Sequence, residues 1–249
     1  MSKDRLSKIG KYIIDKGQVS TEELAYKFDI SIVTVRRDLK KLEEDNVITK
    51  IYGGARAKSD RLKTYEQREN LNRISKEHIA SIARTYINDG DRIFIDSGTT
   101  VENILDGLDD DINLSLFTNN LAIIKKAVLM ENVNLFIVGN YYNSTSNSFT
   151  YWGKVPSLNE FNIDKAFMCT SGLTIIDGLT NKNPLEQEIK RMICSLANNI
   201  YLLVDDSKIG KSSLMSYAKL EDIDVVITNK FLNNEYVNFL SEHNIELRY

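Results

Sequence analysis

Short apolar runs in the later part of this sequence are each followed at once by polar residues that can bind an anion. Such segments are 96–100 (Asp-Ser-Gly-Thr-Thr), 118–120 (Thr-Asn-Asn) and 205–208 (Asp-Asp-Ser-Lys). A glycine with hydroxyl residues ahead of a helix exposes backbone N–H groups and adds side-chain donors, and a lysine adds positive charge. This chemistry suits a phosphate. The predicted anion site is made of Asp96, Ser97, Gly98, Thr99, Thr100, Thr118, Asn119, Asn120, Asp205 and Lys208.

The elements that position these segments are a predicted parallel sheet and its helices. Apolar runs alternate with helix-like segments, which is typical of a mostly parallel sheet with helices on both faces. Ligands of such sheets bind beyond the carboxyl ends of the strands, where the three segments lie. Each segment alone is more typical of a turn or a cap, but their shared placement favours a ligand site. The runs cover residues 92–96, 113–118, 134–139, 166–170, 200–205 and 225–228, and the helices begin near Val101, Leu121, Pro184 and Glu235.

A different chemistry is concentrated in the first 60 residues. They hold 13 Lys and Arg against 10 Asp and Glu, in a chain whose net charge is −3. Three short helices are predicted there: one that ends before Gly17, a second that starts with a capping box between Ser20 and Glu23, and a third that is capped by Ser31. The local positive excess suits an anionic partner.

The third helix presents a basic face. Its apolar residues Ile32, Val35, Leu39 and Leu42 form one stripe, and at about 100° per residue Arg37 points almost directly away from that stripe. Small side chains near the start of the outward face and cations farther along have the chemistry of a helix that reads the DNA major groove. Asp38 is predicted to lie to the side. The predicted DNA-binding residues of this helix are Ser31, Val33, Thr34, Arg36, Arg37, Lys40 and Lys41.

The residues after the third helix favour DNA binding over a merely solvated basic face. Residues 47–52, V-I-T-K-I-Y, alternate as a strand does, and Gly53-Gly54 permits a tight reversal of the backbone. Three helices followed by such a strand pair outline a winged helix-turn-helix domain. Lys50 and Tyr52 are the predicted DNA-binding residues of the wing.

This outline resembles a known family. The run I-S-I-V-T-V-R-R-D-L-K-K-L-E, followed by V-I-T-K-I-Y-G-G-A, closely resembles the amino-terminal signature of the DeoR family of bacterial transcriptional regulators, over residues 3–57. The resemblance implies a repressor of a sugar-metabolism operon that binds a double-stranded DNA operator. Lys50 stands where the family usually has Arg, which keeps a phosphate-binding cation but gives up bidentate geometry.

The later part of the chain resembles the effector domain of the same family. The motifs are G-D-R-I-F-I-D-S-G-T-T, T-N-N, a glycine at position 153 and D-D-S-K-I-G. That domain is similar to ribose-5-phosphate isomerase, so the resemblance implies a phosphorylated sugar as effector. It adds Gly153, Glu186 and Lys190 to the effector-binding residues. Gly139-Asn140 replaces the usual Gly-Gly, which places an extra side chain near the expected rim of the pocket.

These patterns predict an α/β chain of two domains. Residues 1–57 form the winged helix-turn-helix domain, residues 58–76 a charged linker, and residues 77–249 the effector-binding domain with its mostly parallel sheet. A homo-oligomer, either a dimer or a tetramer, is the expected assembly.

An enzyme acting on sugar phosphates is the alternative function. An isomerase or deaminase would use Asp96, Glu186 or Asp205 as a base. The winged domain and the lack of a nearby histidine argue against catalysis, so no catalytic residue is predicted. Cys169 and Cys194 lie in apolar surroundings without metal-site spacing, and neither a cofactor nor a metal is expected. No apolar run approaches the roughly 20 residues that span a membrane, and the first residues lack a signal-peptide pattern, so a cytoplasmic protein is expected.

Overall fold

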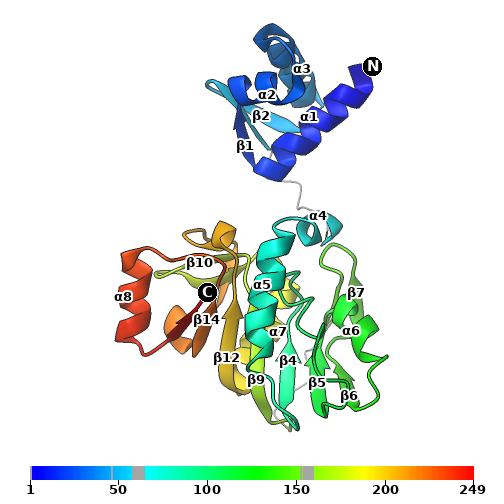
Figure 1. Ribbon diagram of the computed structural model, residues 1–249, viewed down its shortest axis with the longest axis vertical. Helices are drawn as coiled ribbons and strands as arrows, with labels where there is room; N and C mark the ends of the chain where they lie inside the picture. The colour runs from blue at the N-terminus through cyan, green and yellow to red at the C-terminus, as the bar shows by residue number, and fades with distance from the viewer. Residues whose placement is uncertain (1, 46, 58–64, 152, 154–159) are drawn as a thin grey trace. The chain divides into compact units, whose positions relative to one another are not determined.

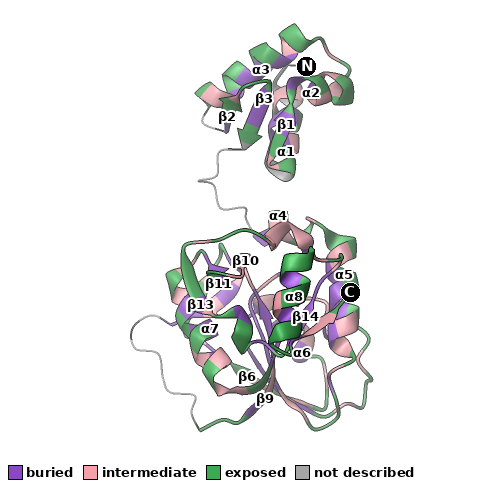
Figure 2. Cartoon of the chain, turned by 90° about the vertical axis from the view of Figure 1, so that its left-hand side faces the viewer, coloured by how far each residue is buried: buried purple, intermediate pink, exposed green. Residues whose placement is uncertain are grey.

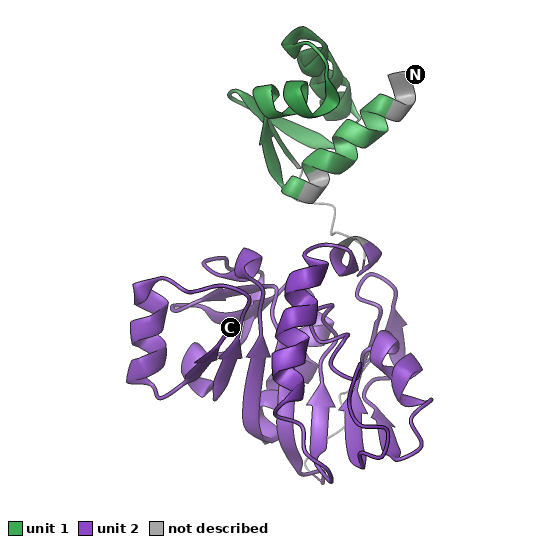
Figure 3. Cartoon of the chain, in the orientation of Figure 1, with its two compact units in different colours: residues 1–63 green, residues 64–249 purple. Residues whose placement is uncertain are grey.

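The computed structural model describes residues 2–45, 47–57, 65–151, 153 and 160–249. The chain divides into two compact units, residues 1–63 and residues 64–249, which Figure 3 shows in different colours. Within the described residues, no helix has the length and apolar character needed to cross a membrane.

The first unit is a small helical domain with a three-stranded antiparallel sheet (Figure 1). The strand order is β1-β3-β2. The helix starts agree with the sequence: Ser20 Oγ accepts the N–H of Glu23 at 3.0 Å, and Ser31 Oγ accepts the N–H of Thr34 at 3.2 Å. The elements are α1 (Ser2–Lys16), β1 (Gln18–Ser20), α2 (Thr21–Phe28), α3 (Ile32–Glu44), β2 (Ile48–Ile51) and β3 (Gly54–Ala57).

One apolar cluster holds the first unit together. The helices contribute Ile9, Ile13, Leu24, Val35 and Leu39, and all five side chains are buried. Figure 2 shows the buried stretches of these elements in purple. The predicted stripe of α3 is therefore largely confirmed. Ile32 is the exception, because the first turn of the helix leaves its side chain exposed.

The second unit is built on a seven-stranded parallel sheet with the order β15-β14-β12-β9-β4-β5-β6. All six neighbouring pairs in this sheet are parallel. The predicted mostly parallel sheet is confirmed. Its strands are β4 (Arg92–Ile95), β5 (Leu114–Thr118), β6 (Val133–Ile137), β9 (Ile163–Cys169), β12 (Ala197–Leu203), β14 (Val225–Ile227) and β15 (Glu246–Arg248).

Helices cover both faces of this sheet, and the strands bury alternate residues against them (Figure 1). Ile93 and Ile95 of β4 belong to an apolar cluster with residues of α5 and α6, whereas Phe94 belongs to a second cluster that includes residues of α7 and α8. Side chains of successive strand residues point to opposite faces, so each strand needs apolar residues throughout. The helices are α5 (Arg73–Arg84), α6 (Leu121–Ala127), α7 (Pro184–Leu196) and α8 (Asn234–Glu242).

Smaller elements complete the second unit. A hairpin is formed by β7 (Tyr141–Asn143) and β8 (Ser148–Thr150). A separate antiparallel sheet has the order β10-β11-β13. The remaining elements are α4 (Tyr65–Glu69), β10 (Gly172–Thr174), β11 (Gly178–Asn181), β13 (Met215–Ala218) and the 3-10 turns η1 (Asp206–Lys208) and η2 (Leu220–Asp222).

The helix predicted to begin near Val101 is absent. Residues 99–107, which lie in the described part of the chain, form consecutive turns and bends. The carbonyl oxygens of Asn103 and Ile104 accept hydrogen bonds from the Arg84 side chain, at 3.0 and 3.1 Å. The Asn103 carbonyl also accepts the N–H of Asp106, three residues later, at 3.2 Å, which is the hydrogen bond of a turn and not that of an α-helix.

The second unit begins earlier than residue 77. Within the predicted linker 58–76, residues 65–69 form α4 and residues 73–76 open α5. The first turn of α5 is rich in charged residues, and the buried apolar residues of this helix begin only at Ile79 and Ala80. The sequence of residues 73–76 therefore does not indicate an amphipathic helix. Residues 58–64 lie outside the described part of the chain.

Candidate functional site

The outward face of α3 is exposed and basic. Arg36, Arg37, Lys40 and Lys41 are all exposed, and the side chain of Val33 is 76% exposed near the start of the helix. The first unit therefore presents the small and cationic side chains that the sequence placed on this face. Ser31 is also exposed, at the cap of α3, and Thr34 is half-buried beside it.

Asp38 lies inside the first unit and not at its side as predicted. Its carboxylate is 2% exposed and binds the guanidinium of Arg5 on α1, with Nε at 2.8 Å and Nη2 at 3.2 Å. The Asp38 carboxylate raises the pKa of Arg5, chiefly through this hydrogen bond. The arginine neutralises a carboxylate that helical periodicity alone would leave lateral.

The wing follows α3 and returns at two glycines. Gly53 has a φ of +75°, a conformation that favours glycine. At Gly54 a Cβ atom would lie 2.2 Å from the carbonyl oxygen of Val19, because β3 pairs with β1 at this point. The G-G-A end of the motif is thus required by the backbone. Tyr52 at the turn is fully exposed.

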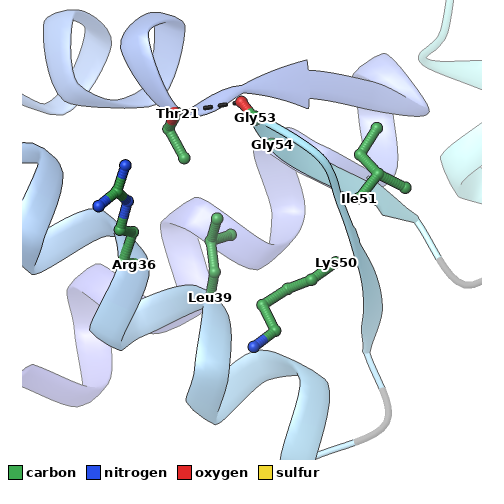
Figure 4. A pocket seen from close by; sticks show the side chains of 7 residues that line it. All are labelled: Thr21, Arg36, Leu39, Lys50, Ile51, Gly53 and Gly54. Atoms are coloured by element: carbon green, nitrogen blue, oxygen red, sulfur yellow. Dashed lines mark hydrogen bonds between the residues drawn. The ribbon is translucent and has the colours of Figure 1, made fainter.

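A cleft of about 240 Å³ lies between α3 and the wing (Figure 4). Arg36 and Lys50 stand on either side of Leu39 in this view. The Lys50 ammonium is 3.0 Å from the Glu43 carboxylate, which also accepts the Lys50 backbone N–H at 2.9 Å. Glu43 thus joins α3 to the wing. The cleft is lined by Thr21, Arg36, Leu39, Lys50, Ile51, Gly53 and Gly54.

In the second unit, the strand order reverses between β4 and β9. The next strands along the chain, β5 and β6, lie on one side of β4, whereas β9 and β12 lie on the other. Such a switch point at the carboxyl ends of parallel strands is a common ligand site. Asp96 and Cys169 stand there at the two strand ends, and the Cys169 N–H donates to the Asp96 carboxylate at 2.8 Å.

Asp96 and Lys190 form a buried ion pair at this switch point. Their side chains are 0% and 5% exposed, and Lys190 also donates to the carbonyl oxygen of Cys169 at 2.9 Å. Burial alone would lower the pKa of Lys190, but the charges of Asp96 and Glu186 raise it above its usual range. Lys190 is therefore an ammonium that connects α7 to the ends of β4 and β9.

Glu186, one turn before Lys190 on α7, reaches two further elements. Its carboxylate accepts hydrogen bonds from Ser148 of β8 at 3.2 Å and from Asn181 of β11 at 3.0 Å. Glu186 is buried. Neither Ser148 nor Asn181 was among the predicted residues, because a serine or asparagine inside a short strand carries no distinctive spacing.

The Thr118-Asn119-Asn120 segment is buried beside the end of β4. Thr118 Oγ1 donates to the Ile95 carbonyl at 2.6 Å, and Asn120 Nδ2 donates to the Asp96 carbonyl at 3.2 Å. Asn119 Nδ2 donates to a carbonyl of the β7–β8 hairpin at 3.1 Å. The Asn119 Oδ1 atom is buried and finds no hydrogen-bond partner among the described residues.

A buried lysine that sequence reasoning missed lies near Asp205 and Lys208. Lys76 of α5 is 5% exposed, and burial lowers the pKa of its ammonium to about 8, assisted by the charge of Lys208 and opposed by that of Asp205. Lys76 continues the apolar stripe of Ile79 and Ala80 at helical spacing, which was the available signal in the sequence. Asp205 is buried and Lys208 is half-buried.

The segment that opens the second unit contacts these loops directly. Arg68 of α4 donates to the carbonyl of Thr145 in the β7–β8 hairpin at 3.1 Å, and the Lys76 ammonium donates to the carbonyl of Arg68. Asn72, between α4 and α5, lies 3.4 Å from the Asp205 carboxylate. Residues 65–76 therefore contact the loops that follow the carboxyl ends of the strands around the switch point. We call this edge of the sheet the switch edge.

Some of the remaining predicted residues lie beside these hydrogen bonds at the ends of β4 and β9, and others do not. Ser97, Thr99 and Thr100 are buried in the turns after β4. At Gly98 a Cβ atom would lie 2.5 Å from the Cys169 side chain, so the close approach of the two strand ends requires glycine there. Gly153 is exposed and sits between residues outside the described part of the chain. Asn140 is exposed, at the base of the β7–β8 hairpin.

A winged helix-turn-helix unit followed by an α/β unit with a polar switch edge is the architecture of a ligand-controlled transcriptional regulator. The model of the DeoR-like helix-turn-helix domain matches residues 5–61, and that of the DeoR C terminal sensor domain matches residues 71–230. The chain belongs to the DeoR family of transcriptional regulators.

Curated relatives match along almost the whole chain. The HTH-type transcriptional regulator IolR of Bacillus subtilis is 41% identical, over 97% of this chain and 96% of that protein. The lactose phosphotransferase system repressor of Staphylococcus epidermidis is 33% identical, over 91% of both. The glycerol-3-phosphate regulon repressor of Escherichia coli is 30% identical, over 93% of this chain and 92% of that protein. Among solved structures, ribose 5-phosphate isomerase A of Methanocaldococcus jannaschii matches with a TM-score of 0.42 and 18% identity, over 55% of both chains.

Proposed function

We propose that this regulator represses a sugar-metabolism operon and that a phosphorylated sugar, bound at the switch edge of the second unit, controls its affinity for the operator. The observation that carries the proposal is the pair of neighbouring cations Lys76 and Lys208 beside a cluster of buried hydroxyl, amide and carboxylate groups. The names of two relatives, which refer to a lactose phosphotransferase system and to glycerol-3-phosphate, support this class of effector.

In this proposal, different residues bind the phosphate and the sugar of the ligand. Lys76 and Lys208 bind the phosphate, because two ammonium groups that repel each other gain when a dianion lies between them. Asn119, whose Oδ1 atom lacks a partner among the described residues, accepts a sugar hydroxyl. Asp96 and Lys190 already satisfy each other, so they hold the strand ends in place and contact the sugar less.

The coupling to DNA follows from the burial of the site. Lys76 and Asn119, which bind the ligand in this proposal, are both buried, so a ligand must displace the segments that cover them. Residues 65–76 are bonded to those segments and directly follow the first unit in the chain. The ligand shifts operator affinity only by its unequal affinity for the two states, and typical couplings are about 1–3 kcal/mol.

On DNA, α3 lies in the major groove and the wing contacts the backbone. Helix-turn-helix proteins usually bind two half-sites as a symmetric pair, so a homo-oligomer is part of the proposal. Arg37 reads a base from the outermost position of α3, and Lys40, Lys41 and Lys50 bind phosphates.

The test uses an operator duplex selected by the protein from a random pool. Its affinity is measured by fluorescence anisotropy with a panel of sugar phosphates, the parent sugars and inorganic phosphate. We expect one phosphorylated sugar to change operator affinity about five- to 150-fold while its unphosphorylated parent does not. Constant affinity across sugar phosphates that bind by calorimetry would contradict the proposed control.

Two variants separate effector binding from DNA binding. We expect Lys208→Ala to keep operator affinity and lose the response, whereas Arg191→Ala, an exposed change on α7, keeps both. Incubation of aldose and ketose phosphates with the protein tests the enzyme alternative. The proposal includes no catalysis, so turnover above background would contradict it.

A further inference from the structure

The cation of the wing is not free in this structure. Lys50 is one of two cations at the cleft between α3 and the wing, and Glu43 holds it twice, through the ammonium at 3.0 Å and the backbone N–H at 2.9 Å. The side chains of Lys50 and Glu43 are 42% and 39% exposed. A DNA phosphate that approaches Lys50 therefore meets a carboxylate that already occupies the ammonium.

The other cations of this surface are held less firmly. Lys40 is 3.9 Å from Glu44, and both side chains are more than 60% exposed. Glu22, which is close enough to Arg36 for their charges to interact, accepts the Thr21 hydroxyl at 3.1 Å. Glu43 is thus the carboxylate that most directly competes for a cation of the cleft.

We infer that Glu43 is an internal competitor for the DNA backbone: it occupies Lys50 in the free protein, and binding of DNA transfers the Lys50 ammonium from Glu43 to a backbone phosphate. The inference rests on the proposed DNA-binding function and adds a residue to it. The cleft can receive a stretch of backbone, since Arg36 and Lys50 stand on either side of it and both cations can meet a phosphate there.

The exchange has a thermodynamic signature. When a lysine neutralises a phosphate, a condensed counterion is released, and log K falls with log salt by about 0.9 for each such contact. If the lysine leaves a carboxylate behind, that carboxylate takes up a cation from solution, which offsets the release. Lys50 therefore adds little to the salt dependence while Glu43 is ionised, and a full contact once Glu43 has lost its charge.

The pair of Glu43 and Lys50 also favours specific over non-specific DNA binding. Any duplex offers phosphates, so a free lysine strengthens binding to every sequence. A lysine that must first leave a carboxylate contributes less binding free energy when it contacts a poorly placed phosphate. The pair therefore weakens loose encounters more than the complex in which α3 is seated in the groove.

The test compares Glu43→Gln with the wild type on a random-sequence duplex over a range of salt concentrations. The amide keeps an acceptor for the Lys50 backbone N–H and removes only the charge. We expect Glu43→Gln to bind about two- to five-fold more tightly, the range of an exposed ion pair, and to steepen the salt slope by about 0.9. The matched control is Asp45→Asn, an exposed carboxylate at the end of the same helix.

A double-mutant cycle with Lys50→Gln decides whether the effect passes through Lys50. We expect Glu43→Gln to have no more effect than Asp45→Asn once Lys50 is gone. An equal effect of Glu43→Gln in both backgrounds, or weaker binding with an intact melting temperature, would overturn the competitor role. If the wild type binds no duplex at all, the proposed function fails, which is a different outcome from a normal wild type with an inert Glu43→Gln.

Discussion

The guanidinium of Arg5 holds both carboxylate oxygens of Asp38, at 2.8 and 3.2 Å, and so ties the first helix of the chain to the helix that carries the basic face. The two residues are unequally buried: the Asp38 side chain is 2% exposed and that of Arg5 is 29% exposed. Loss of either partner therefore leaves a different residue unpaired, and the two losses have different consequences.

Removal of the arginine is expected to be the more damaging change. In Arg5→Met the Asp38 carboxylate stays buried without its partner, whereas in Asp38→Asn the Arg5 guanidinium can reach water. We expect Arg5→Met to lower the melting temperature of the first unit more than Asp38→Asn, and Lys11→Met, an exposed change on the same helix, to leave it unchanged. Thermal unfolding of the full chain checks this order, and equal melting temperatures in all three variants would contradict it.

Arg37 is expected to carry sequence discrimination. It is exposed on α3, and helical spacing places it opposite the apolar stripe of that helix. We expect Arg37→Ala to weaken binding to the selected operator by about 1–3 kcal/mol and to affect random-sequence DNA much less. Anisotropy titrations of both duplexes measure the difference. A loss of the same size on both would assign Arg37 to the phosphate backbone, and base reading would then move to Thr34 or Arg36.

Gly54 is expected to tolerate no side chain. Its Cβ would lie 2.2 Å from the Val19 carbonyl oxygen, so an alanine must push β1 and β3 apart. We expect Gly54→Ala to destabilise the first unit by about 1–3 kcal/mol and to weaken DNA binding. Effector binding by the second unit serves as the internal control. Normal stability and DNA binding in this variant would show that the wing can shift without cost.

Much of both units could be predicted from local pattern. Capping by Ser20 and Ser31 and the strands of the sheet depend on neighbouring residues, and the structure agrees. The burial of Asp38 depends on Arg5, 33 positions away, which no periodicity reveals. The turns that replace the helix expected near Val101 likewise bind a distant residue, because the Arg84 side chain donates to the carbonyls of Asn103 and Ile104.

The candidate sites were predicted in part for the same reason. Residues at strand ends can be found from the strands, and the structure brings Asp96, Asn120 and Lys190 together. Lys76 was hidden in a charged stretch read as a linker, although it extends an apolar stripe. The role of Glu43 cannot be predicted from the sequence, because its contact with Lys50 exists only when the wing has folded against α3.

Lys76 is expected to give the proposed effector site a pH dependence. Burial lowers the pKa of this ammonium to about 8, so the folded protein binds a proton at Lys76 less readily than the unfolded chain does. The charge is present below about pH 8 and is lost above it. We expect affinity for a sugar phosphate to fall from pH 7 to pH 9, and the phosphate itself is already a dianion there because its second pKa is about 6. Calorimetry on wild type and Lys76→Met checks this, and an equal slope in both would contradict it.

Lys190 is expected to be essential for the stability of the second unit. Lys190→Met leaves the Asp96 carboxylate buried and unpaired, which costs about 3–5 kcal/mol of unfolding free energy. Arg191→Met, an exposed neighbour on the same helix, is the matched control. Denaturant unfolding of the full chain measures both. A Lys190 variant as stable as its control would show that the Asp96–Lys190 pair adds no net stability to the second unit.

The order of the strands along the chain determines when the switch edge can form during synthesis. Asp96 at the end of β4 needs Cys169 at the end of β9, and 73 residues separate them. A ribosome therefore completes the DNA-binding unit, then β4 to β6, well before the neighbour that β4 requires has been made. Domains generally fold as units from the amino end, so the first unit can fold before the carboxyl ends of β4 and β9 have met.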